Sequence, residues 1–342
     1  MNTKLNTNET EEELLIKINE LNISNEDNFI NFIDLFAGTG GFSVAFEKYN
    51  KFKCIFANDM IKESENIYKL NHPNTNFLLK DLHKVKLEEI PNHQILCGGF
   101  PCQPFSIAGE KKGFNDARSN VFWKILEIIK EYNPNIIILE NVKNLKSHDE
   151  GNTYKIIEKN LKDLKYYIKS AILDTSKITN VPHHRERVYI VCFKDINQYE
   201  KFNFDFPEVK NKKIKDFLED NIDKKYYYTD KLKIYETVKN NVTKNIDENV
   251  LYQYRRHYIR ENKSNCCPTL TANMGSGGHN VPLLLDNKGI RKLTPQECFN
   301  LQGFPDNYKL PEISDSALYK LAGNAISVPI VELIVDKINL LF

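Results

Sequence analysis

Short apolar segments alternate with amphipathic helical segments between residues 30 and 193, and this alternation constrains the fold more than any other feature. Strands that are buried on both faces of a parallel sheet are continuously apolar, and helices connect them across those faces. The pattern therefore predicts an α/β fold whose doubly wound sheet is mostly parallel and has about seven strands. The strand segments, in chain order, are FINFIDLF, FKCIFAND, TNFLLKD, HQILCGGF, PNIIILENV, YYIKSAILD and RVYIVCF.

Amino-acid composition and periodicity divide the chain into three parts. Residues 1–29 are rich in Glu and Asn, and we expect them to form an acidic N-terminal extension. Residues 195–265 are rich in Lys, Asn and Tyr and show little periodicity, which predicts a smaller inserted domain over 195–291. Helical patterns return near the end, so residues 30–194 and 292–342 together are predicted to form the larger domain.

The charge of the chain is almost balanced, with 47 Lys and Arg against 46 Asp and Glu and a formal net charge of +1. Over the whole chain this balance argues against a nucleic-acid partner, because such proteins are usually basic. Residues 1–31, however, contain two Lys and seven acidic residues, so the remaining 311 residues carry 45 basic against 39 acidic side chains. The body of the protein is therefore modestly basic, and a nucleic-acid partner stays open.

Cysteine usage and hydropathy indicate the cellular compartment of the protein. No apolar run reaches the ~20 residues of a membrane-spanning helix, and no signal-peptide pattern opens the chain. The seven Cys are scattered without a Cys-x-x-Cys pair or a His cluster, which argues against a disulfide scaffold and a structural metal. We therefore expect a cytoplasmic protein that has no membrane partner and no metal.

Glycines and acidic residues follow three successive strand segments. FAGTGGFS places Gly38, Gly40 and Gly41 between a strand and a helix, where they allow a sharp turn and close approach of a ligand. Such a turn alone is compatible with NAD, a nucleotide, S-adenosylmethionine or no ligand. Asp59 ends the second strand, where a carboxylate can accept hydrogen bonds from ribose hydroxyls, and Asp81 ends the third. Together these positions predict an adenosine-type cofactor.

Reactive side chains follow the later strand segments. Cys102 lies in the stiff segment GGFPCQPFS after the fourth strand, where a thiolate could attack an electrophilic ring carbon. Glu140 directly follows the apolar run IIIL, so we expect its carboxylate to face the same crevice. Arg185 and Arg187 alternate in HHRERVYIV and can hold a carboxylate or a phosphate from one side. The alternative for the two arginines is an exposed strand edge that is protected by charge.

These segments, in this order, resemble the DNA cytosine-5 methyltransferases, in particular the single-chain bacterial enzymes of type II restriction–modification systems. The resemblance extends from about Phe32 to Phe342 and rests on FAGTGGFS, GGFPCQPFS, ENV, HHRERV, KLTPQECFNLQGFP and AGNAISVP. It implies a Rossmann-like, S-adenosylmethionine-dependent catalytic domain at 30–194 and 292–342. The segment 195–291 would then be the target recognition domain.

The resemblance implies a role for each catalytic residue. Cys102 would attack carbon 6 of a cytosine flipped out of double-stranded DNA, while Glu140 would contact ring nitrogen 3 and the exocyclic amine. Carbon 5 would then take the methyl group, and elimination of Cys102 would release 5-methylcytosine. Arg185 and Arg187 would hold the cytosine and Glu140, and Gln103 is suited to the space that the base vacates. The base that removes the carbon-5 proton is not identified.

The resemblance also assigns contacts to the cofactor, S-adenosyl-L-methionine. Phe36 would lie against the adenine, Asp59 would accept the ribose hydroxyls and Asp81 the adenine amine. Asn324 would in addition tie the returning C-terminal helix to the catalytic region. The expected cofactor-binding residues are Phe36, Gly38, Gly40, Gly41, Asp59, Met60, Asp81, Leu82, Val121, Asn324 and Ala325.

Contacts to DNA are expected from the segment around Cys102, from the loop that follows it and from the inserted domain. In the loop GEKKGFNDARSN, Lys111 and Lys112 suit phosphates, and in the inserted domain Arg255 or Arg256 is a candidate for reading guanine. Thr269 is similar to a family position that contacts the phosphate near the flipped base. The expected DNA-binding residues are Gln103, Ser106, Lys111, Lys112, Arg255, Arg256, Arg260 and Thr269.

Three other classes are weighed against this one. A tRNA cytosine-5 methyltransferase shares the fold, but its usual Cys-Phe-Thr tripeptide is not found, since Cys192-Phe193 is followed by Lys194. A catalytically silent DNA-binding or regulatory homologue is not expected to retain Cys102, Glu140, Arg185 and Arg187 intact. An oxidoreductase would explain the glycines and leave the Pro-Cys-Gln segment without a role. We expect a monomer that acts on double-stranded DNA beside a restriction endonuclease, with no stable complex between the two.

Overall fold

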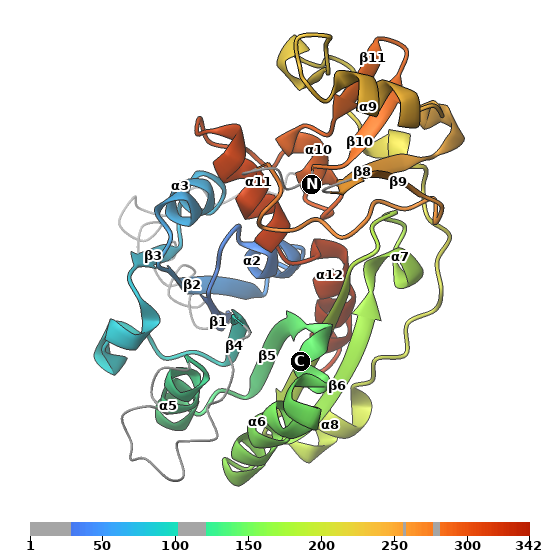
Figure 1. The fold of residues 1–342 in the computed structure, drawn as a ribbon. Helices are drawn as coiled ribbons and strands as arrows, with labels where there is room; N and C mark the ends of the chain where they lie inside the picture. The colour runs from blue at the N-terminus through green and yellow to red at the C-terminus, as the bar shows by residue number, and fades with distance from the viewer. Residues whose placement is uncertain (1–28, 102–120, 256–257, 276–280) are drawn as a thin grey trace, which may run out of the picture.

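The structure is a computed structural model that describes residues 29–101, 121–255, 258–275 and 281–342. It consists of a seven-stranded sheet with helices on both faces and a four-stranded sheet, which lies at the top of Figure 1. Several sequence predictions fall outside the described residues. They are the acidic segment up to residue 28 and the side chains of Cys102, Gln103, Ser106, Lys111, Lys112 and Arg256.

The large sheet confirms the predicted architecture. Its strand order is β3-β2-β1-β4-β5-β7-β6, and all neighbouring pairs are parallel except the two pairs that include β7. The strand order reverses between β1 and β4, which is where doubly wound sheets bind ligands, beyond the carboxyl ends of the strands. The strands are β1 (Ile30–Leu35), β2 (Phe52–Asp59), β3 (Asn76–Leu79), β4 (Ile95–Gly99), β5 (Ile136–Val142), β6 (Tyr167–Asp174) and β7 (Glu186–Phe193).

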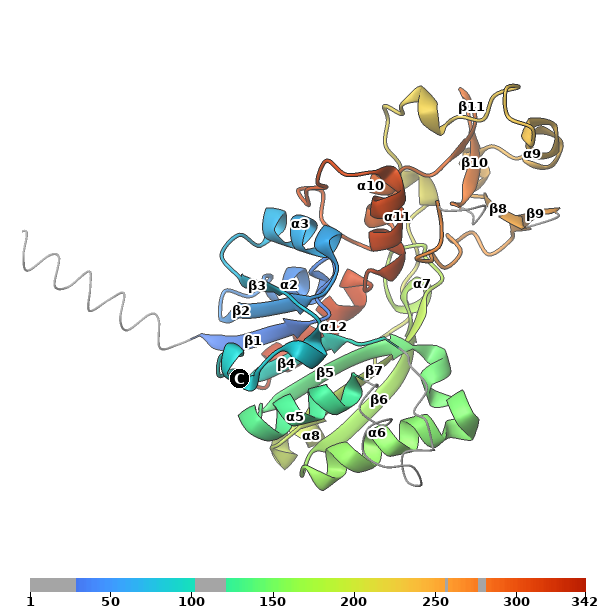
Figure 2. The same ribbon diagram turned by 60° about the vertical axis from the view of Figure 1, so that its left-hand side comes forward.

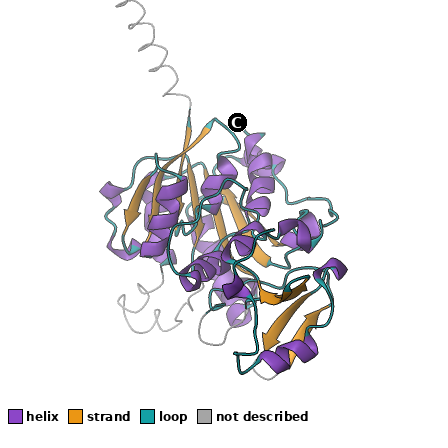
Figure 3. Cartoon of the chain, turned by 90° about the horizontal axis from the view of Figure 1, so that it is seen from above, coloured by secondary structure: helices purple, strands orange, loops and turns teal. Residues whose placement is uncertain are grey.

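Helices cover both faces of the large sheet. Those that pack against it are α2 (Gly41–Phe46), α3 (Lys62–Asn71), α5 (Phe122–Tyr132), α6 (Asn152–Asp163), α8 (Ile196–Lys201) and α12 (Val328–Asn339). The short α7 (Thr175–Ile178) follows β6, and α10 (Pro295–Asn300) and α11 (Asp315–Asn324) pack with the smaller domain. Successive strand residues alternate between two hydrophobic clusters, so Ile33 packs with α5 and α6 and Phe32 packs with α2 and α12. Figures 2 and 3 show the resulting layers of helix, sheet and helix. The end of the chain therefore packs against a sheet that residues 30–193 form.

The small sheet is antiparallel and has the strand order β11-β10-β8-β9. Its elements are α9 (Tyr235–Asn241), β8 (Leu251–Arg255), β9 (Tyr258–Asn262), β10 (Leu283–Asp286) and β11 (Gly289–Lys292). Val238 of α9 packs with Tyr252, Leu283 and Ile290 in one cluster. A second cluster joins this sheet to α10 and α11, so the smaller domain is fixed to the C-terminal helices.

The first part of the segment 195–291 packs differently from the sequence prediction. Helix α8 contacts β6 and β7, and the fully buried Phe202 belongs to the cluster of the large sheet. Phe204 and Phe206 are partly buried, and their apolar rings pack against the same cluster and extend it. Residues 196–206 thus pack with the larger domain, and the body of the smaller domain begins later in the chain.

One segment among the described residues, Asp315–Asn339, has the length and composition of a membrane-spanning helix, although the sequence predicted none. It comprises α11 and α12, which are separate helices, and 72% of its most apolar window is buried inside the protein. Ile330, Ile334 and Ile338 of α12 all lie in the core beside the large sheet. Packing in the core accounts for the apolar composition of this segment.

Candidate active site

A cavity of about 600 Å³ opens at the carboxyl ends of the central strands of the large sheet. The turn after β1, the end of β2, the segment after β4, the end of β5 and the connection between α11 and α12 all contribute to its walls. Pro101, which precedes Cys102 in the sequence, also lines it. The predicted site residues that the cavity brings together are Phe36, Gly38, Gly41, Asp59, Met60, Glu140, Arg185, Arg187, Asn324 and Ala325.

The turn after β1 is held in a conformation that few side chains adopt. Phe36 has a φ of 56° and Gly38 a φ of 53°, both in the left-handed region. A non-glycine residue there costs about 1–3 kcal/mol, and such strain is concentrated at functional sites. An added Cβ at Gly38 would meet the backbone of Phe36 at 3.7 Å and Asp59 Oδ2 at 4.0 Å. The bare glycine therefore leaves the space beside Asp59 open.

Asp59 presents a buried carboxylate at the end of β2. The backbone N–H of Gly38 donates to Oδ2 at 2.9 Å, and that of Ile61 donates to Oδ1 at 3.0 Å. Burial raises the pKa of Asp59, and the backbone donors act in the opposite direction. Each carboxylate oxygen has a second lone pair, so Asp59 can still accept from the hydroxyls of a ligand in the cavity.

Four of the predicted cofactor-binding residues lie outside the lining of this cavity. Gly40 packs against α3, where an added Cβ would lie 2.7 Å from His72 Nε2. Asp81 follows the end of β3 and accepts from the backbone N–H of His83 at 3.0 Å, capping a short 3-10 helix. Leu82 and Val121 are buried in the core cluster of the large sheet.

Glu140 and Arg187 form an ion pair in the cavity, with Arg187 Nε 3.1 Å from Glu140 Oε1. Strand β7 pairs with both β5 and β6, so the two arginines do not protect a sheet edge, and that alternative is wrong. Burial raises the pKa of Glu140, while the charges of Arg187 and then Arg185 lower it. The site therefore holds a carboxyl group that retains its proton to higher pH than a free glutamate does.

Arg185 has a largely structural set of contacts. The residue is 2% exposed, and its guanidinium donates to the carbonyls of Leu270 at 3.2 Å, Gly323 at 3.4 Å and Ala325 at 2.6 Å. Burial lowers the pKa of Arg185 to about 9, helped by Arg187, which leaves it charged at neutral pH. Its Nε finds no hydrogen-bond partner among the described residues. Arg185 thus ties the smaller domain and the end of α11 to the cavity wall.

Sequence reasoning missed several residues of the cavity. Asn141 donates from Nδ2 to the carbonyl of Phe100 at 2.9 Å and joins β5 to the segment that leads to Cys102. Its place directly after Glu140 was a signal that could have found it. Glu63, Ser64 and Lys320 also line the cavity, from α3 and α11, where no local pattern distinguished them from surface residues. No group of three His, Cys, Asp or Glu side chains suited to a metal occurs in the described part of the chain.

A second hollow, of about 300 Å³, lies between the smaller domain and the start of β7, and we call it the groove. It gathers three predicted DNA-binding residues, Arg255, Arg260 and Thr269. Sequence reasoning assigned no role to its other members, which include His184 from the larger domain. Its lining residues are His184, Gln253, Tyr254, Arg255, Arg260, Asn262, Ser264, Pro268, Thr269 and Thr271.

The fold and the cavity define an α/β protein of the S-adenosylmethionine-dependent methyltransferase class. Comparison with known families makes the assignment specific, since the model of the C-5 cytosine-specific DNA methylases matches residues 30–340. The chain belongs to this family and is a DNA cytosine-5 methyltransferase.

Individual relatives agree with the family. The type II methyltransferase M.Bsp6I of Bacillus sp. (strain RFL6) is 45% identical over 308 residues, which cover 89% of this chain and 96% of the relative. The type II methyltransferase M.HhaI of Haemophilus parahaemolyticus is 32% identical over 316 residues, covering 91% and 94%. The solved structure of the Entamoeba histolytica methyltransferase EhMeth matches with a TM-score of 0.69 at 23% identity, covering 92% and 99%, and so shares the fold.

Proposed function

We propose that this chain transfers a methyl group from S-adenosyl-L-methionine to carbon 5 of a cytosine flipped out of double-stranded DNA, with Cys102 as the nucleophile. The observation that carries the proposal is that one cavity holds both the Phe36–Asp59 side, which suits a cofactor, and the Glu140–Arg187 pair, which suits a base. Pro101 lines the same cavity, so the segment that bears Cys102 begins at its wall.

The residues present fit the cofactor. Asp59 retains acceptor capacity for ribose hydroxyls, and Gly38 leaves room for a ligand beside it. Phe36 and the exposed side chain of Met60 supply apolar surfaces for an adenine ring. Asn324 is exposed at the cavity and can hydrogen-bond to polar groups of a ligand. When bound, S-adenosyl-L-methionine supplies an electrophilic methyl group on a sulfonium.

Glu140 can activate the base. Because burial raises its pKa, the carboxyl group can donate a proton to ring nitrogen 3 of cytosine, which draws electrons away from carbon 6. The ion pair with Arg187 holds the carboxyl group in a fixed orientation at 3.1 Å. Flipping the base out of the duplex, at a cost of about a few kcal/mol, brings the ring within reach of these groups.

Cys102 then makes carbon 5 a nucleophile. Its thiolate would form a bond to carbon 6, and the electron pair of the C5–C6 double bond would become available at carbon 5. Carbon 5 would then take the methyl group as the methyl–sulfur bond breaks and its electron pair stays on the sulfur. Loss of the carbon-5 proton to a base restores that double bond, breaks the S–C6 bond and releases Cys102 as a thiolate. Without this addition an unactivated aromatic carbon would not displace a sulfonium.

We place the reaction in a restriction–modification system, in agreement with the type II methyltransferases to which the chain is similar. The smaller domain, within 195–291, would be the target recognition domain, and its groove would face the DNA. A monomer would act in the cytoplasm on the site that a separate restriction endonuclease cleaves, with no stable complex between the two. A tRNA substrate is the second candidate, and the sequence favours DNA over it, since the Cys-Phe-Thr tripeptide of the tRNA branch is not found and Cys192-Phe193 is followed by Lys194.

Methylation mapping tests the proposal. DNA from cells that express the protein should show 5-methylcytosine at one short sequence by bisulfite sequencing, and cells that express Cys102→Ala should show none. The Cys102→Ala protein should still bind S-adenosyl-L-methionine and DNA, which controls for folding. Undiminished methylation by that variant would exclude Cys102 as the nucleophile, and methylation of tRNA alone would exclude the DNA substrate.

A further inference from the structure

We propose that His184, oriented by Asp174, donates a hydrogen bond from Nε2 to a backbone phosphate of the bound DNA, beside the cavity that receives the target base. The inference rests on the proposed function, because it takes DNA as the substrate. It adds a phosphate-binding residue to which neither the sequence motifs nor the family resemblance gives a role.

The groove suits a polyanion. Arg255 and Arg260 are exposed on neighbouring strands of the small sheet, and His184 faces them from the larger domain. None of the described residues that line the groove is acidic. The cavity of the active site differs, since Asp59, Glu63 and Glu140 line it. Phosphate contacts of this kind fix the register of a protein on a duplex without reading its sequence.

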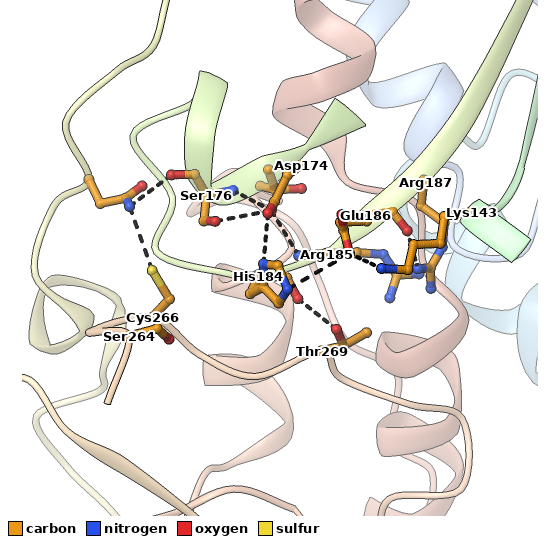
Figure 4. A network of polar contacts seen from close by, with 12 residues as sticks. Lys143, Asp174, Ser176, His184, Arg185, Glu186, Arg187, Ser264, Cys266 and Thr269 are labelled. Atoms are coloured by element: carbon orange, nitrogen blue, oxygen red, sulfur yellow. Dashed lines mark hydrogen bonds and ion pairs between the residues drawn. The ribbon is translucent and has the colours of Figure 1, made fainter. Parts of the chain in front are cut away.

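Asp174 fixes the orientation of the His184 ring, as Figure 4 shows. Its Oδ1 accepts from the backbone N–H of Ser176 at 3.1 Å and of Arg185 at 3.2 Å, and its Oδ2 lies 2.7 Å from His184 Nδ1. The backbone donors show that Asp174 is a carboxylate, and a carboxylate oxygen only accepts hydrogen bonds. The hydrogen of the contact with His184 is therefore on Nδ1, which donates to Asp174. Asp174 is 8% exposed, so this support is built into the end of β6.

The other ring nitrogen of His184 is left for a ligand. Nε2 lies 3.9 Å from Glu186 Oε2, which is too far for a hydrogen bond, and Glu186 is held by Lys143. The side chain of His184 is 52% exposed at the groove. A phosphate oxygen that approaches this nitrogen would meet a ring that cannot turn away.

The backbone contacts of His184 explain why its ring, rather than the hydroxyl of Thr269, donates to a phosphate. The N–H of His184 donates to the carbonyl of Cys267 at 2.9 Å, and its carbonyl accepts from the hydroxyl of Thr269 at 2.7 Å. Thr269 was expected to contact a phosphate, yet its hydroxyl proton is committed to His184 (Figure 4). Beside Thr269, the ring of His184 therefore offers a side-chain donor to a ligand in the groove.

The location of His184 connects the groove to the chemistry. His184 lines the groove and Arg185, the next residue, lines the active-site cavity. Consecutive Cα atoms are about 3.8 Å apart, so a phosphate bound by His184 belongs to a nucleotide near the flipped base. Such a contact would hold the strand while the base leaves the stack.

A ring that donates from both nitrogens is an imidazolium, so the contact requires a protonated His184. The charged groups that face it are the carboxylates of Asp174 at the end of β6 and Glu186 at the start of β7, with Lys143 on Glu186. Across the groove stand Arg255 and Arg260. The contact therefore adds a positive charge to the groove beside those of Arg255 and Arg260.

The salt dependence of DNA binding tests the inference. The full-length protein and its variants would be titrated with a duplex between about 50 and 200 mM salt, because each phosphate contact contributes about 0.9 to the slope of log K against log salt. His184→Ala should reduce the slope by about 0.9, and His184→Lys should retain it. His83→Gln, a change of an exposed histidine outside both hollows, serves as the matched control and should match the wild type.

Two further readouts separate a phosphate contact from a structural role. DNA affinity at low salt should fall in His184→Ala and be retained in His184→Lys, since Lys restores a positive charge at this position. Binding of S-adenosyl-L-methionine should be the same in all variants, since His184 lies outside the cofactor cavity. An unchanged salt slope in His184→Ala, or a His184→Lys protein that binds DNA as weakly as His184→Ala, would overturn the contact alone. A wild-type protein that binds no DNA would overturn the proposed function and the contact with it.

Discussion

Replacing Glu140 by Gln tests the acid in the active site without changing its shape. Gln keeps hydrogen-bonding capacity and loses both the proton and the charge. In the structure Glu140 pairs with Arg187 at 3.1 Å, and the two side chains are 12% and 15% exposed. A general acid contributes about 10²–10⁴-fold to the rate, so we expect Glu140→Gln to slow methyl transfer by that factor.

The same change affects stability by a smaller amount. Exposed ion pairs are worth about 0–1 kcal/mol, and breaking a buried pair costs about 3–5 kcal/mol. The Glu140–Arg187 pair lies between these limits, because both side chains are mostly buried and Arg187 keeps some contact with water. We therefore expect a loss of about 1–3 kcal/mol in the free energy of unfolding, which would leave the protein folded.

Single-turnover transfer of a labelled methyl group to a target duplex, at saturating S-adenosyl-L-methionine, measures the effect on chemistry. Cofactor affinity should be unchanged, because the proposed cofactor contacts, which include Asp59 and Phe36, do not include Glu140. Glu89→Gln, which alters an exposed carboxylate paired with Lys80, is the matched control and should retain the wild-type rate. A Glu140→Gln rate within a few-fold of the wild type would refute the role of Glu140 as the acid.

Three other outcomes follow from the contacts in and around the cavity. Because burial raises the pKa of Glu140, the wild-type single-turnover rate should decline as pH rises through that raised pKa, and Glu140→Gln should lack this decline; matching profiles would contradict the proton donation. Asp59→Asn should weaken S-adenosyl-L-methionine binding by about 1–3 kcal/mol, roughly 5–150-fold, by calorimetry, and unchanged affinity would count against Asp59 as the acceptor. Arg185→Met should lower the free energy of unfolding by about 3–5 kcal/mol in a denaturant titration, because it leaves the carbonyls of Leu270, Gly323 and Ala325 without their donor, whereas a loss below about 1 kcal/mol would contradict that role.

The large sheet could be predicted because its strands are locally distinct. The runs around Ile33, Ile95 and Ile138 are apolar on both faces, and each is followed by a turn residue or a helix pattern. The edge strand β3 was predicted to reach Asp81 and ends at Leu79. Because the strand ends two residues earlier than predicted, Asp81 lies in the connection after it. There it caps a 3-10 helix, and it does not line the cavity.

The smaller domain could not be predicted in detail. Strands β8 and β9 carry polar and aromatic side chains, and β8 pairs with β10 through residues far apart in sequence, such as Tyr252 and Leu283. Local periodicity does not report such pairing. For the same reason the sequence did not predict the contact of His184 with Asp174, which joins the residues before β7 to the end of β6.

The active site was predicted in part. Phe36, Gly38, Asp59, Glu140 and the two arginines converge on one cavity because each stands at the carboxyl end of a strand or beside one. The sequence did not reveal that the guanidinium of Arg185 donates to backbone carbonyls, because those acceptors come from the smaller domain and from the segment around Asn324. Cys102 lies outside the described residues, so its role stays a prediction.

Covalent trapping measures the central claim most directly. Fluorine at carbon 5 of cytosine cannot leave as a proton does, so a duplex that contains 5-fluorocytosine at the methylated site should hold the enzyme in an adduct in the presence of S-adenosyl-L-methionine. We predict a denaturation-resistant complex with the mass of one chain plus the DNA, whose cross-linked peptide contains Cys102, and none with Cys102→Ser. The six cysteines that the structure describes are all buried, which makes Cys102 the expected site of attachment. Methylation of ordinary cytosine without any trapped adduct, or an adduct at another residue, would contradict the account.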